Sequence, residues 1–573
     1  MKRYLYTFLY GFFLCIGGSE LAFAQQNINS TVEVQREYEG KLLKISKSQI
    51  STNFADSLLK LNLSFDYSTF NRPYKDLYDF TPINSIDIAG NYDVTYPSFY
   101  SKFSYSYPIV PFGELYYAPK LGDKFALVID LHHDSFWGKS PLHKVQNDVL
   151  VKDGTVNSDR MANSAGLNFI YSWKNGELYA GGDYDYNYYT FFGLDDYPEA
   201  KEFTSSFMRN NLSHTYSNAH ARVGVRSTNA NERAFKYDIN LKYGYLDDRA
   251  SVFIPSLHYD TSVPLFEHKI NANLMLGYFF NKIHSVKIKA SSMTVKYGGE
   301  LRSNLDGEYD VAPSYNFIQN RWKVDAGVSF SGYYSCCNKS KFFVFPKIYA
   351  SYEVWKNHIW LFAKVDGNSN LYTSSSILDI NPWAFNVQPW SSVSVLRTAL
   401  GFRGTLNNQL NFSIKGGYSI LENLLMFSVQ AKSAMQEALY VDRHNAYFNA
   451  NVDFRIEQFK IGGEFNYNYY NDVVYMMPEL SGKLFAEYNL MKRFFFGVSC
   501  GFRGETFSNI SSSQEDICTL APTYDLGVDI SYVFNNNFTF FIQGRNLLNQ
   551  DIQYVRNYSE KGLNIGAGVC LKF

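Results

Sequence analysis

Residues 562–573 read GLNIGAGVCLKF and alternate strictly between two kinds of side chain. In an extended strand, successive side chains point to opposite faces of the sheet, so every second residue shares a face. The stretch therefore predicts a β-strand with one apolar face and one small or polar face. The apolar face carries Leu563, Ile565, Ala567, Val569, Leu571 and Phe573, and the other face carries Gly562, Asn564, Gly566, Gly568, Cys570 and Lys572.

The same period of two residues recurs in stretches 524–534, 448–456 and 459–469. If the apolar faces met lipid, the polar positions would face a water-filled lumen. A soluble β-sandwich alternates in the same way with its core and solvent faces exchanged, so the pattern alone leaves that alternative open. The polar positions that would set the charge of such a lumen include Asp453, Arg455, Asp525 and Asp529.

The N-terminal segment has the pattern of an export signal. Met1, Lys2 and Arg3 precede an apolar run over residues 4–16, and Ala22-Phe23-Ala24 provides a small-x-small exit. We expect residues 1–24 to be a secretory signal peptide, because the apolar run is too short for a membrane-spanning helix. An anchor helix is the alternative reading.

The composition favours strands that meet lipid. Aromatic residues make up 18% of the chain, with 47 Tyr and 48 Phe, and the mean hydropathy is −0.25. Tyr, Trp and Phe form interfacial girdles around outer-membrane barrels. The net charge of −1 gives no indication of nucleic-acid binding. We therefore expect a β-barrel in the cell outer membrane, with membrane lipid around it.

Turn signals define the number of strands. Ten short turns alternate with longer connections, as in barrels with short periplasmic turns and long external loops, and they predict about 22 antiparallel strands over residues 97–573. Segment 25–96 is expected to be a short periplasmic or lumenal piece. The short turns lie near Leu121-Gly122-Asp123, Lys174-Asn175-Gly176, Asn229-Ala230-Asn231, Asn281-Lys282, Asn320, Lys356-Asn357, Asn407-Asn408, Glu457-Gln458, Asn489-Leu490 and Asn535–Asn537. The long connections are expected at residues 136–159, 193–215, 248–264, 371–394 and 421–443.

The C-terminal residues resemble a known family. Asn546-Leu547-Leu548-Asn549-Gln550, Tyr554, and the closing strand from Gly562 to Phe573 resemble the end of TonB-dependent outer-membrane receptors. In that family the terminal aromatic residue is read by the barrel-assembly machinery, which the resemblance makes a partner through Phe573. Val32-Glu33-Val34 and Tyr38 resemble the N-terminus of the plug-deficient, receptor-like barrels of Bacteroidota.

The resemblance implies that the plug of a complete receptor is missing, because segment 25–96 is shorter than that domain. A barrel of 22 strands would otherwise leave a large aqueous hole. The candidates to fill it are segment 25–96, inward-folded external loops, or a separate partner chain.

No stretch of the sequence predicts catalytic, cofactor-binding or metal-binding residues. Alternation places His132 and Asp134 on one face and His133 on the other, and a closed metal site needs three or four convergent ligands. There is no nucleophile elbow and no HExxH motif, so we expect neither an enzyme nor a cofactor. Cys500 and Cys518 flank one external hairpin, which leaves a disulfide between them open.

The connection over residues 371–394 is rich in aromatic side chains, namely Tyr372, Trp383, Phe385 and Trp390. Exposed aromatic residues often mark contacts with a sugar or a partner protein. They are equally typical of the aromatic belt at the membrane interface. The sequence leaves both readings open.

Two functions follow from these expectations. The resemblance implies solute uptake or passage across the outer membrane, with a TonB-type energy protein or a surface lipoprotein as partner. The alternative is a non-transporting scaffold subunit within an outer-membrane protein complex.

Overall fold

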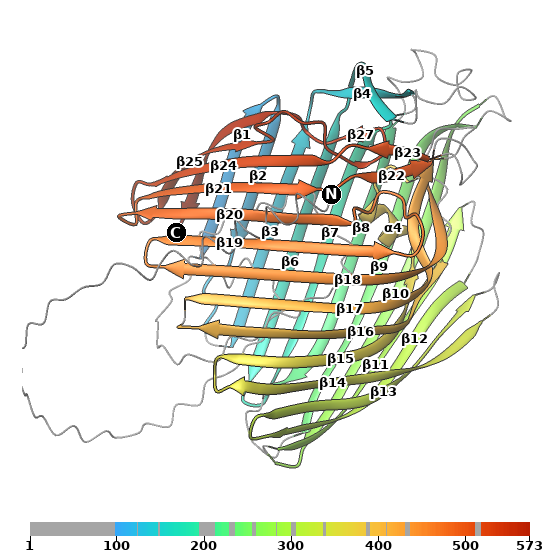
Figure 1. The fold of residues 1–573 in the computed structure, drawn as a ribbon, viewed down its shortest axis with the longest axis vertical. Coiled ribbons are helices and arrows are strands. Elements are labelled where there is room, and N and C mark those ends of the chain that lie inside the picture. The colour runs from blue at the N-terminus through green and yellow to red at the C-terminus, as the bar shows by residue number, and fades with distance from the viewer. Residues whose placement is uncertain are drawn as a thin grey trace, which may run out of the picture. The chain divides into compact units, whose positions relative to one another are not determined.

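The alternating stretches form one antiparallel sheet of 22 strands that closes on itself into a barrel (Figure 1). This confirms the expected fold class and strand number, and a sandwich is excluded because the sheet has no open edge. The barrel strands are β1 (Phe99–Tyr107), β2 (Val110–Tyr117), β3 (Phe125–Phe136), β6 (Arg160–Trp173), β7 (Gly176–Thr190), β8 (Ser213–Ser227), β9 (Phe235–Ile254), β10 (Tyr259–Phe279), β11 (His284–Gly299), β12 (Leu305–Gln319), β13 (Trp322–Ser335), β14 (Lys341–Trp355), β15 (Ile359–Tyr372), β16 (Trp390–Leu406), β17 (Leu410–Val429), β18 (Gln436–Ile456), β19 (Phe459–Tyr470), β20 (Leu480–Leu490), β21 (Phe494–Arg503), β24 (Thr523–Val533), β25 (Phe538–Arg545) and β28 (Asn564–Lys572).

The computed structural model describes residues 98–122, 124–146, 149–193, 213–228, 235–254, 259–281, 283–299, 305–335, 340–384, 390–407, 409–429, 436–509 and 517–573. The signal peptide expected at residues 1–24 and the segment 25–96 lie outside the described residues. Residues 336–339, which include two of the cysteines, and Phe385 do so as well. No helix in the described ranges is long and apolar enough to cross a membrane.

The first and last strands close the barrel. β1 pairs with β28 in antiparallel register from Tyr100↔Lys572 to Tyr107↔Ile565. Phe99 and Phe573 exchange both backbone hydrogen bonds at 2.9 Å, and their rings lie 6.1 Å apart. Closure leaves the 22-stranded sheet without an edge strand, as a barrel within lipid requires.

The two faces of the strands are those that the alternation predicts. Ile565 of β28, Ile461 of β19 and Leu484 of β20 are about half exposed, at 51%, 52% and 59%. Asp529 of β24 faces the other way and is 2% exposed, in an ion pair with Arg545 at 2.8 Å. The outward side chains therefore meet lipid while charged groups line the interior, as in outer-membrane barrels.

The short turns that fall in the described ranges lie where the sequence places them, with one exception, while the turn expected at Asn229-Ala230-Asn231 lies outside the described residues. The turn expected at Asn489-Leu490 comes two residues later, because β20 extends to Leu490 and the turn occupies residues 491–493. Met491 and Lys492 adopt positive φ there, at 55° and 58°. Met and Lys rarely adopt positive φ, so residues 491–493 carry no recognisable turn signal in the sequence.

Several stretches expected to be loops at the other end are strands. Residues 248–264 belong mostly to β9 and β10, which stay paired up to Tyr259↔Ile254. Much of 421–443 belongs to β17 and β18. The prediction was wrong because it relied on the alternation of apolar and polar residues. Lipid requires that alternation only where the strands cross the membrane, whereas the backbone pairing of these strands continues further.

Small elements fill the remaining external connections. They comprise β4 (Lys139–Gln146), β5 (Val149–Asn157), α4 (Ser374–Ile380), β22 (Thr506–Asn509), β23 (Ile517–Leu520), β26 (Gln553–Val555) and β27 (Tyr558–Ser559).

Candidate functional site: the outer cap and the wall beneath it

The external connections pack against one another and form what we call the cap. They come from several points around the barrel, so their contact bridges strands that are far apart in the sheet. The cap consists of residues 139–146, 149–157, 191–193, 373–384, 471–479, 506–509, 517–520 and 546–563.

A second sheet joins two of these connections. β4 and β5, between β3 and β6, form one hairpin, and β22 and β23, between β21 and β24, form another. β23 pairs with β5 in parallel at Thr519↔Val149, which makes a four-stranded sheet. Connections separated by several barrel strands therefore share backbone hydrogen bonds, which hold the cap together independently of the wall.

Trp383 forms the centre of the cap's apolar core. It is 6% exposed, stacks on Tyr558 with ring centroids 4.5 Å apart, and meets Tyr189 edge-on at 5.5 Å. Its indole Nε1 donates to the carbonyl of Thr190 at 3.2 Å. The core joins residues of barrel strands and of several external connections, namely Val156, Tyr189, Phe191, Phe192, Tyr216, Leu246, Leu378, Trp383, Val429, Val555 and Tyr558. Such aromatic pairs add about 0.5–1.5 kcal/mol each beyond area burial.

Ion pairs attach the connection 546–563, which leads into the last strand β28, to β3 and β6 beyond the junction of β28 with β1. Lys561 Nζ lies 2.8 Å from Asp134 Oδ1 at the end of β3, and Arg160 lies 2.8 Å from Glu560. Burial lowers the pKa of Lys561, and Asp134 offsets part of that effect. The charges therefore depend on each other, since either alone would be buried without a counter-ion.

His143 of β4 and Asp551 form a further contact of this connection. His143 is 5% exposed and also lies 3.1 Å from Gln553 Nε2. Burial by itself raises the pKa of Asp551, but hydrogen bonds from His143, Ser559 and Gln553 outweigh it, so the pKa lies below the ordinary 3.8. The carboxylate is held ionised.

Arg556, which is completely buried, joins three more parts of the cap. Its guanidinium donates to the carbonyl of Asn509, and its own carbonyl accepts from Gln436 Nε2 at 3.2 Å. Asn509 in turn exchanges two hydrogen bonds with the backbone of Val429, at 2.8 and 2.7 Å. β17, β18, β22 and the connection 546–563 are thus linked around Arg556 and Asn509.

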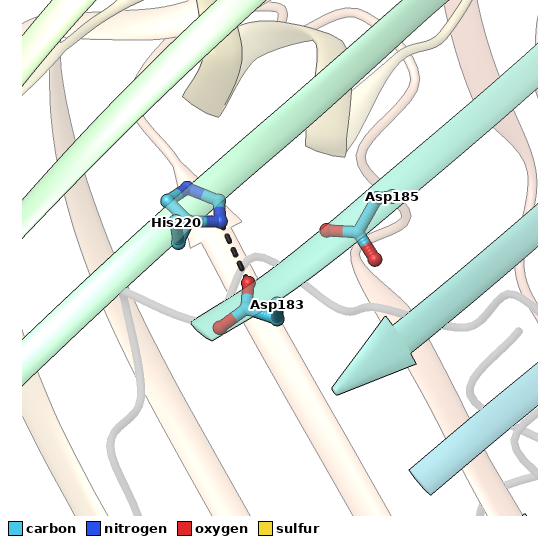
Figure 2. A group of neighbouring side chains, drawn as sticks. All are labelled: Asp183, Asp185 and His220. Carbon is cyan, nitrogen blue, oxygen red and sulfur yellow. Dashed lines mark hydrogen bonds and ion pairs between the residues drawn. The ribbon is translucent and has the colours of Figure 1, made fainter. Parts of the chain in front are cut away.

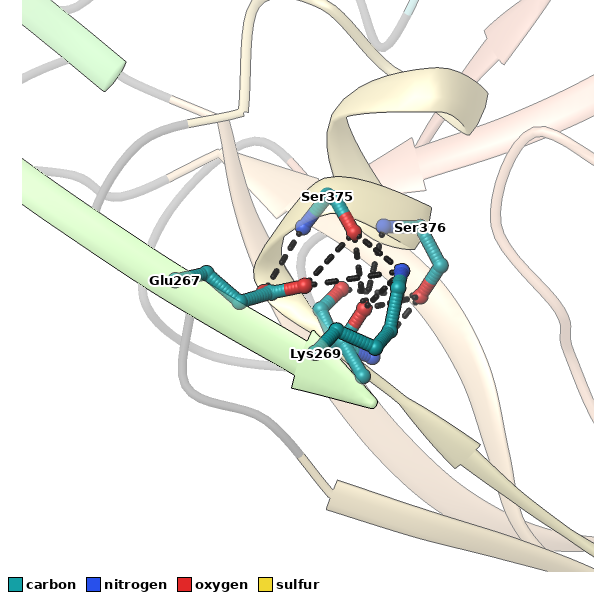
Figure 3. Close-up of polar contacts among 5 residues, drawn as sticks. Glu267, Lys269, Ser375 and Ser376 are labelled. Atoms are coloured by element: carbon teal, nitrogen blue, oxygen red, sulfur yellow. Dashed lines mark hydrogen bonds and ion pairs between the residues drawn. The ribbon is translucent and has the colours of Figure 1, made fainter. Parts of the chain in front are cut away.

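The short helix α4 is attached to the wall by β10 (Figure 3). Glu267 accepts from the backbone N–H and the hydroxyl of Ser375, at 3.1 and 2.7 Å. Lys269 Nζ donates to the same hydroxyl at 2.6 Å. The helix α4 follows β15, whereas Glu267 and Lys269 belong to β10. The contact therefore joins two parts of the wall that are separated by the strands β11–β14.

Beneath the cap, one register row crosses six neighbouring strands of the wall. The pairings that define it run from β3 through β6, β7, β8 and β9 to β10. Two members are glycines, so the charged members are the only side chains along the row. The row consists of Asp130, Gly166, Asp183, His220, Gly244 and Lys269.

Two charged groups of this row are in direct contact, and Asp185 lies next to them (Figure 2). His220 Nδ1 is 2.7 Å from Asp183 Oδ2. Asp185 shares the face of Asp183 on β7, two residues further along. No sequence pattern reveals this group as a whole. The alternation around Tyr184 indicates that the two aspartates share a face, but only the register of β8 brings His220 opposite Asp183.

The residues singled out in 132–134 do not converge. His132 lies 3.7 Å from Glu114, and Asp134 pairs with Lys561. His133 lies on the other face, 2.7 Å from Asn163. The structure thus separates these three residues, as the alternation predicts.

Two sequence hypotheses are corrected. Tyr372 and Trp383 are neither an exposed contact surface nor a belt at the interface, because they are 5% and 6% exposed inside the cap. Their burial depends on packing partners that are distant in sequence, such as Tyr558, and no local sequence pattern reveals these partners. Cys500 carries a free thiol, so the bridge to Cys518 is wrong. Cys518 instead packs among apolar residues of the cap.

The polar positions of the late strands are only partly available to a solute. Asp529 is paired with Arg545, and Asp525 accepts from the backbone N–H of Asn546 at 3.0 Å. Both thereby support the start of the connection 546–563. Asp453 and Arg455 are exposed close to the short turn at residues 457–458.

Comparison with known proteins identifies the architecture. No family model and no curated protein matches the sequence. Solved structures do match: the FrpB iron transporter from Neisseria meningitidis has a TM-score of 0.64 at 9% identity, over 84% of this chain and 82% of that chain. The fold is that of the TonB-dependent receptor barrels.

Two further structures agree. The ferric-catecholate import receptor Fiu from E. coli has a TM-score of 0.60 at 10% identity and covers 83% of this chain and 82% of that chain. The copper transporter OprC has a TM-score of 0.61 at 10% identity, with coverages of 83% and 80%. A barrel of this kind resides in the outer membrane, as its lipid-facing strands require.

Proposed function

We propose that this receptor-like barrel passes a solute across the outer membrane and that the cap is its external gate. The observation that carries the proposal is the packing of six external connections against one another, on a barrel whose wall is lined with charged side chains. A wall that only filled space would be apolar, because burying charge is unfavourable. Here Asp183 and Lys364 have side chains that are 38% and 44% exposed, so water reaches the interior.

The structural neighbours support the proposal in general terms. They are transporters of iron and copper and an import receptor. At 8–10% identity the likeness carries the architecture, and the solute of this chain does not follow from it. We propose that a TonB-type energy protein acts from the periplasm, and that segment 25–96 takes the place of a full plug.

Reconstitution into liposomes tests the transport proposal. The full chain and a variant with the cap core opened, Trp383→Ala, are compared for swelling in sugars of increasing size. We expect little swelling for the unaltered protein and size-limited swelling for the variant. Equal, negligible swelling of both would contradict a gated channel, provided that the variant migrates as a folded barrel on a heat-modifiability gel.

A scaffold subunit is the second candidate, and the extent of the cap favours it. An outer surface built from six connections suits the binding of other outer-membrane proteins or a surface lipoprotein. Purification of the tagged chain in mild detergent, with quantification of co-purifying proteins, separates the two functions. A TonB-type protein at near-equal amount would support transport, whereas stoichiometric secretion or assembly subunits would favour the scaffold.

A further inference from the structure

Three side chains on the wall bring possible ligand atoms close together. Asp183, Asp185 and His220 each contribute one such atom, and all of these atoms lie within 4.8 Å of one another (Figure 2). All three side chains are half-buried. Two carboxylates and one imidazole form a donor set that suits first-row divalent metals, because imidazole favours these ions while carboxylate accepts them.

The neighbouring strands leave room on both sides of this group. Gly166 faces Asp183 in the register, and a Cβ there would collide with the carboxylate of Asp130. Gly244 faces His220, and a Cβ there would lie 3.0 Å from the imidazole Cδ2. The two glycines therefore allow Asp130 and the His220 ring to lie against the backbone of the adjacent strands, next to Asp183.

Groups of both charge signs surround the three side chains. His220, Lys242 and Arg222 act on Asp183, and Asp183 and Asp130 act on each other. Arg222 also donates to Asn168. Carboxylate oxygens of this kind are ligands that divalent cations accept.

The cap determines what can reach this place. Lys269, the last member of the same register row, donates to Ser375 of α4 at 2.6 Å, and Leu246 of β9 belongs to the cap core. The ligand group is therefore close to the inner side of the cap. An ion bound here would lie beneath the described part of the cap.

We propose that Asp183, Asp185 and His220 bind a divalent first-row transition-metal ion on the lumen wall beneath the cap. Asp130 lies beside the site and adds negative charge. Calcium is a poorer fit, since it prefers six to eight oxygen ligands and this site includes an imidazole. The proposal concerns binding alone and holds whether or not the barrel transports a solute.

Zinc titration of the purified full chain in detergent tests the site. The protein is treated with a chelator, desalted and titrated with Zn²⁺ by calorimetry. We expect one saturable site per chain, and a loss of affinity of about tenfold or more in Asp185→Asn and in His220→Gln. An excess of Ca²⁺ is expected to leave zinc binding unchanged.

His132→Gln is the matched control. His132 lies on the same wall with a single carboxylate, Glu114, at 3.7 Å, so its loss should not alter zinc affinity. Heat-modifiable migration verifies that each variant forms a barrel. The absence of a saturable site, or zinc binding that survives both Asp185→Asn and His220→Gln, would overturn the proposal and leave an ion-pair network only. Displacement of zinc by Ca²⁺ would overturn the metal class.

Discussion

The two ends of the barrel use the same strands in opposite ways. At one end the strands are joined by short turns, such as the one at Asn357, whose φ of 60° reverses the chain locally. Nothing in the described turns reaches across the barrel. At the other end the connections leave the wall and meet, so that Trp383 stacks on Tyr558 from a distant strand pair.

This difference shows that closing a sheet and joining its external connections are separate physical problems. The sheet closes through backbone pairing and needs only local reversal at each turn. The cap is held together by side-chain packing and ion pairs between segments that no turn connects. We therefore expect substitutions in the cap to alter permeability and substitutions at the turns to alter barrel stability.

The largest effect is expected for Trp383→Ala. Removing a large buried aromatic side chain costs about 3–5 kcal/mol, which shifts the ratio of open to closed caps by roughly two orders of magnitude or more. Single-channel conductance in planar bilayers would measure the change. Trp322→Ala is the control, because Trp322 is 49% exposed near a short turn. Equal conductance of the two variants would refute the role of the cap.

Asp134→Asn is expected to have a somewhat smaller effect, up to about 3 kcal/mol, because it leaves the Lys561 ammonium without its counter-ion. Faster proteolysis of the connection 546–563 on intact cells would report it. Glu487→Gln removes the partner of Lys460 near a short turn and should leave this proteolysis unchanged. If both variants are cleaved at the rate of the unaltered protein, the ion pair contributes nothing to closure.

Acid should loosen the cap through Asp551. Its pKa in the closed cap is below 3.8 because of the hydrogen bonds from His143, Ser559 and Gln553. The closed state therefore binds this proton less tightly than an open one, so the stabilisation is present above about pH 4 and is lost as the pH falls further. Conductance measured between pH 7 and pH 3 would follow the loss. In Asp551→Asn the contribution of this group to the pH dependence should disappear.

The smallest effect is expected at the opposite end. Asn357→Ala places a side chain that disfavours positive φ in the turn, at a cost of about 1 kcal/mol, whereas Asn357→Gly should be neutral or nearly so. The midpoint of urea unfolding would fall slightly for the alanine variant, and conductance should stay unchanged. An open channel in Asn357→Ala would contradict the separation between the two ends.

The alternation over residues 562–573 and the Asn-rich turns determine most of the barrel from sequence alone. They predict the lipid face, the lumen face and the number of strands, because each depends on neighbours two residues apart or on one local reversal. The error at 491–493 and the misread loops at 248–264 and 421–443 occur where that local information ends.

Only the tertiary structure decides the cap and the wall beneath it. Lys561 and Asp134 are separated by 427 positions and His143 and Asp551 by 408, and no period in the sequence relates them. His220 meets Asp183 only because β8 pairs with β7 in one particular register. Such contacts arise from the closure of the sheet, which brings distant segments together. Their residues therefore carry no local pattern that would reveal them.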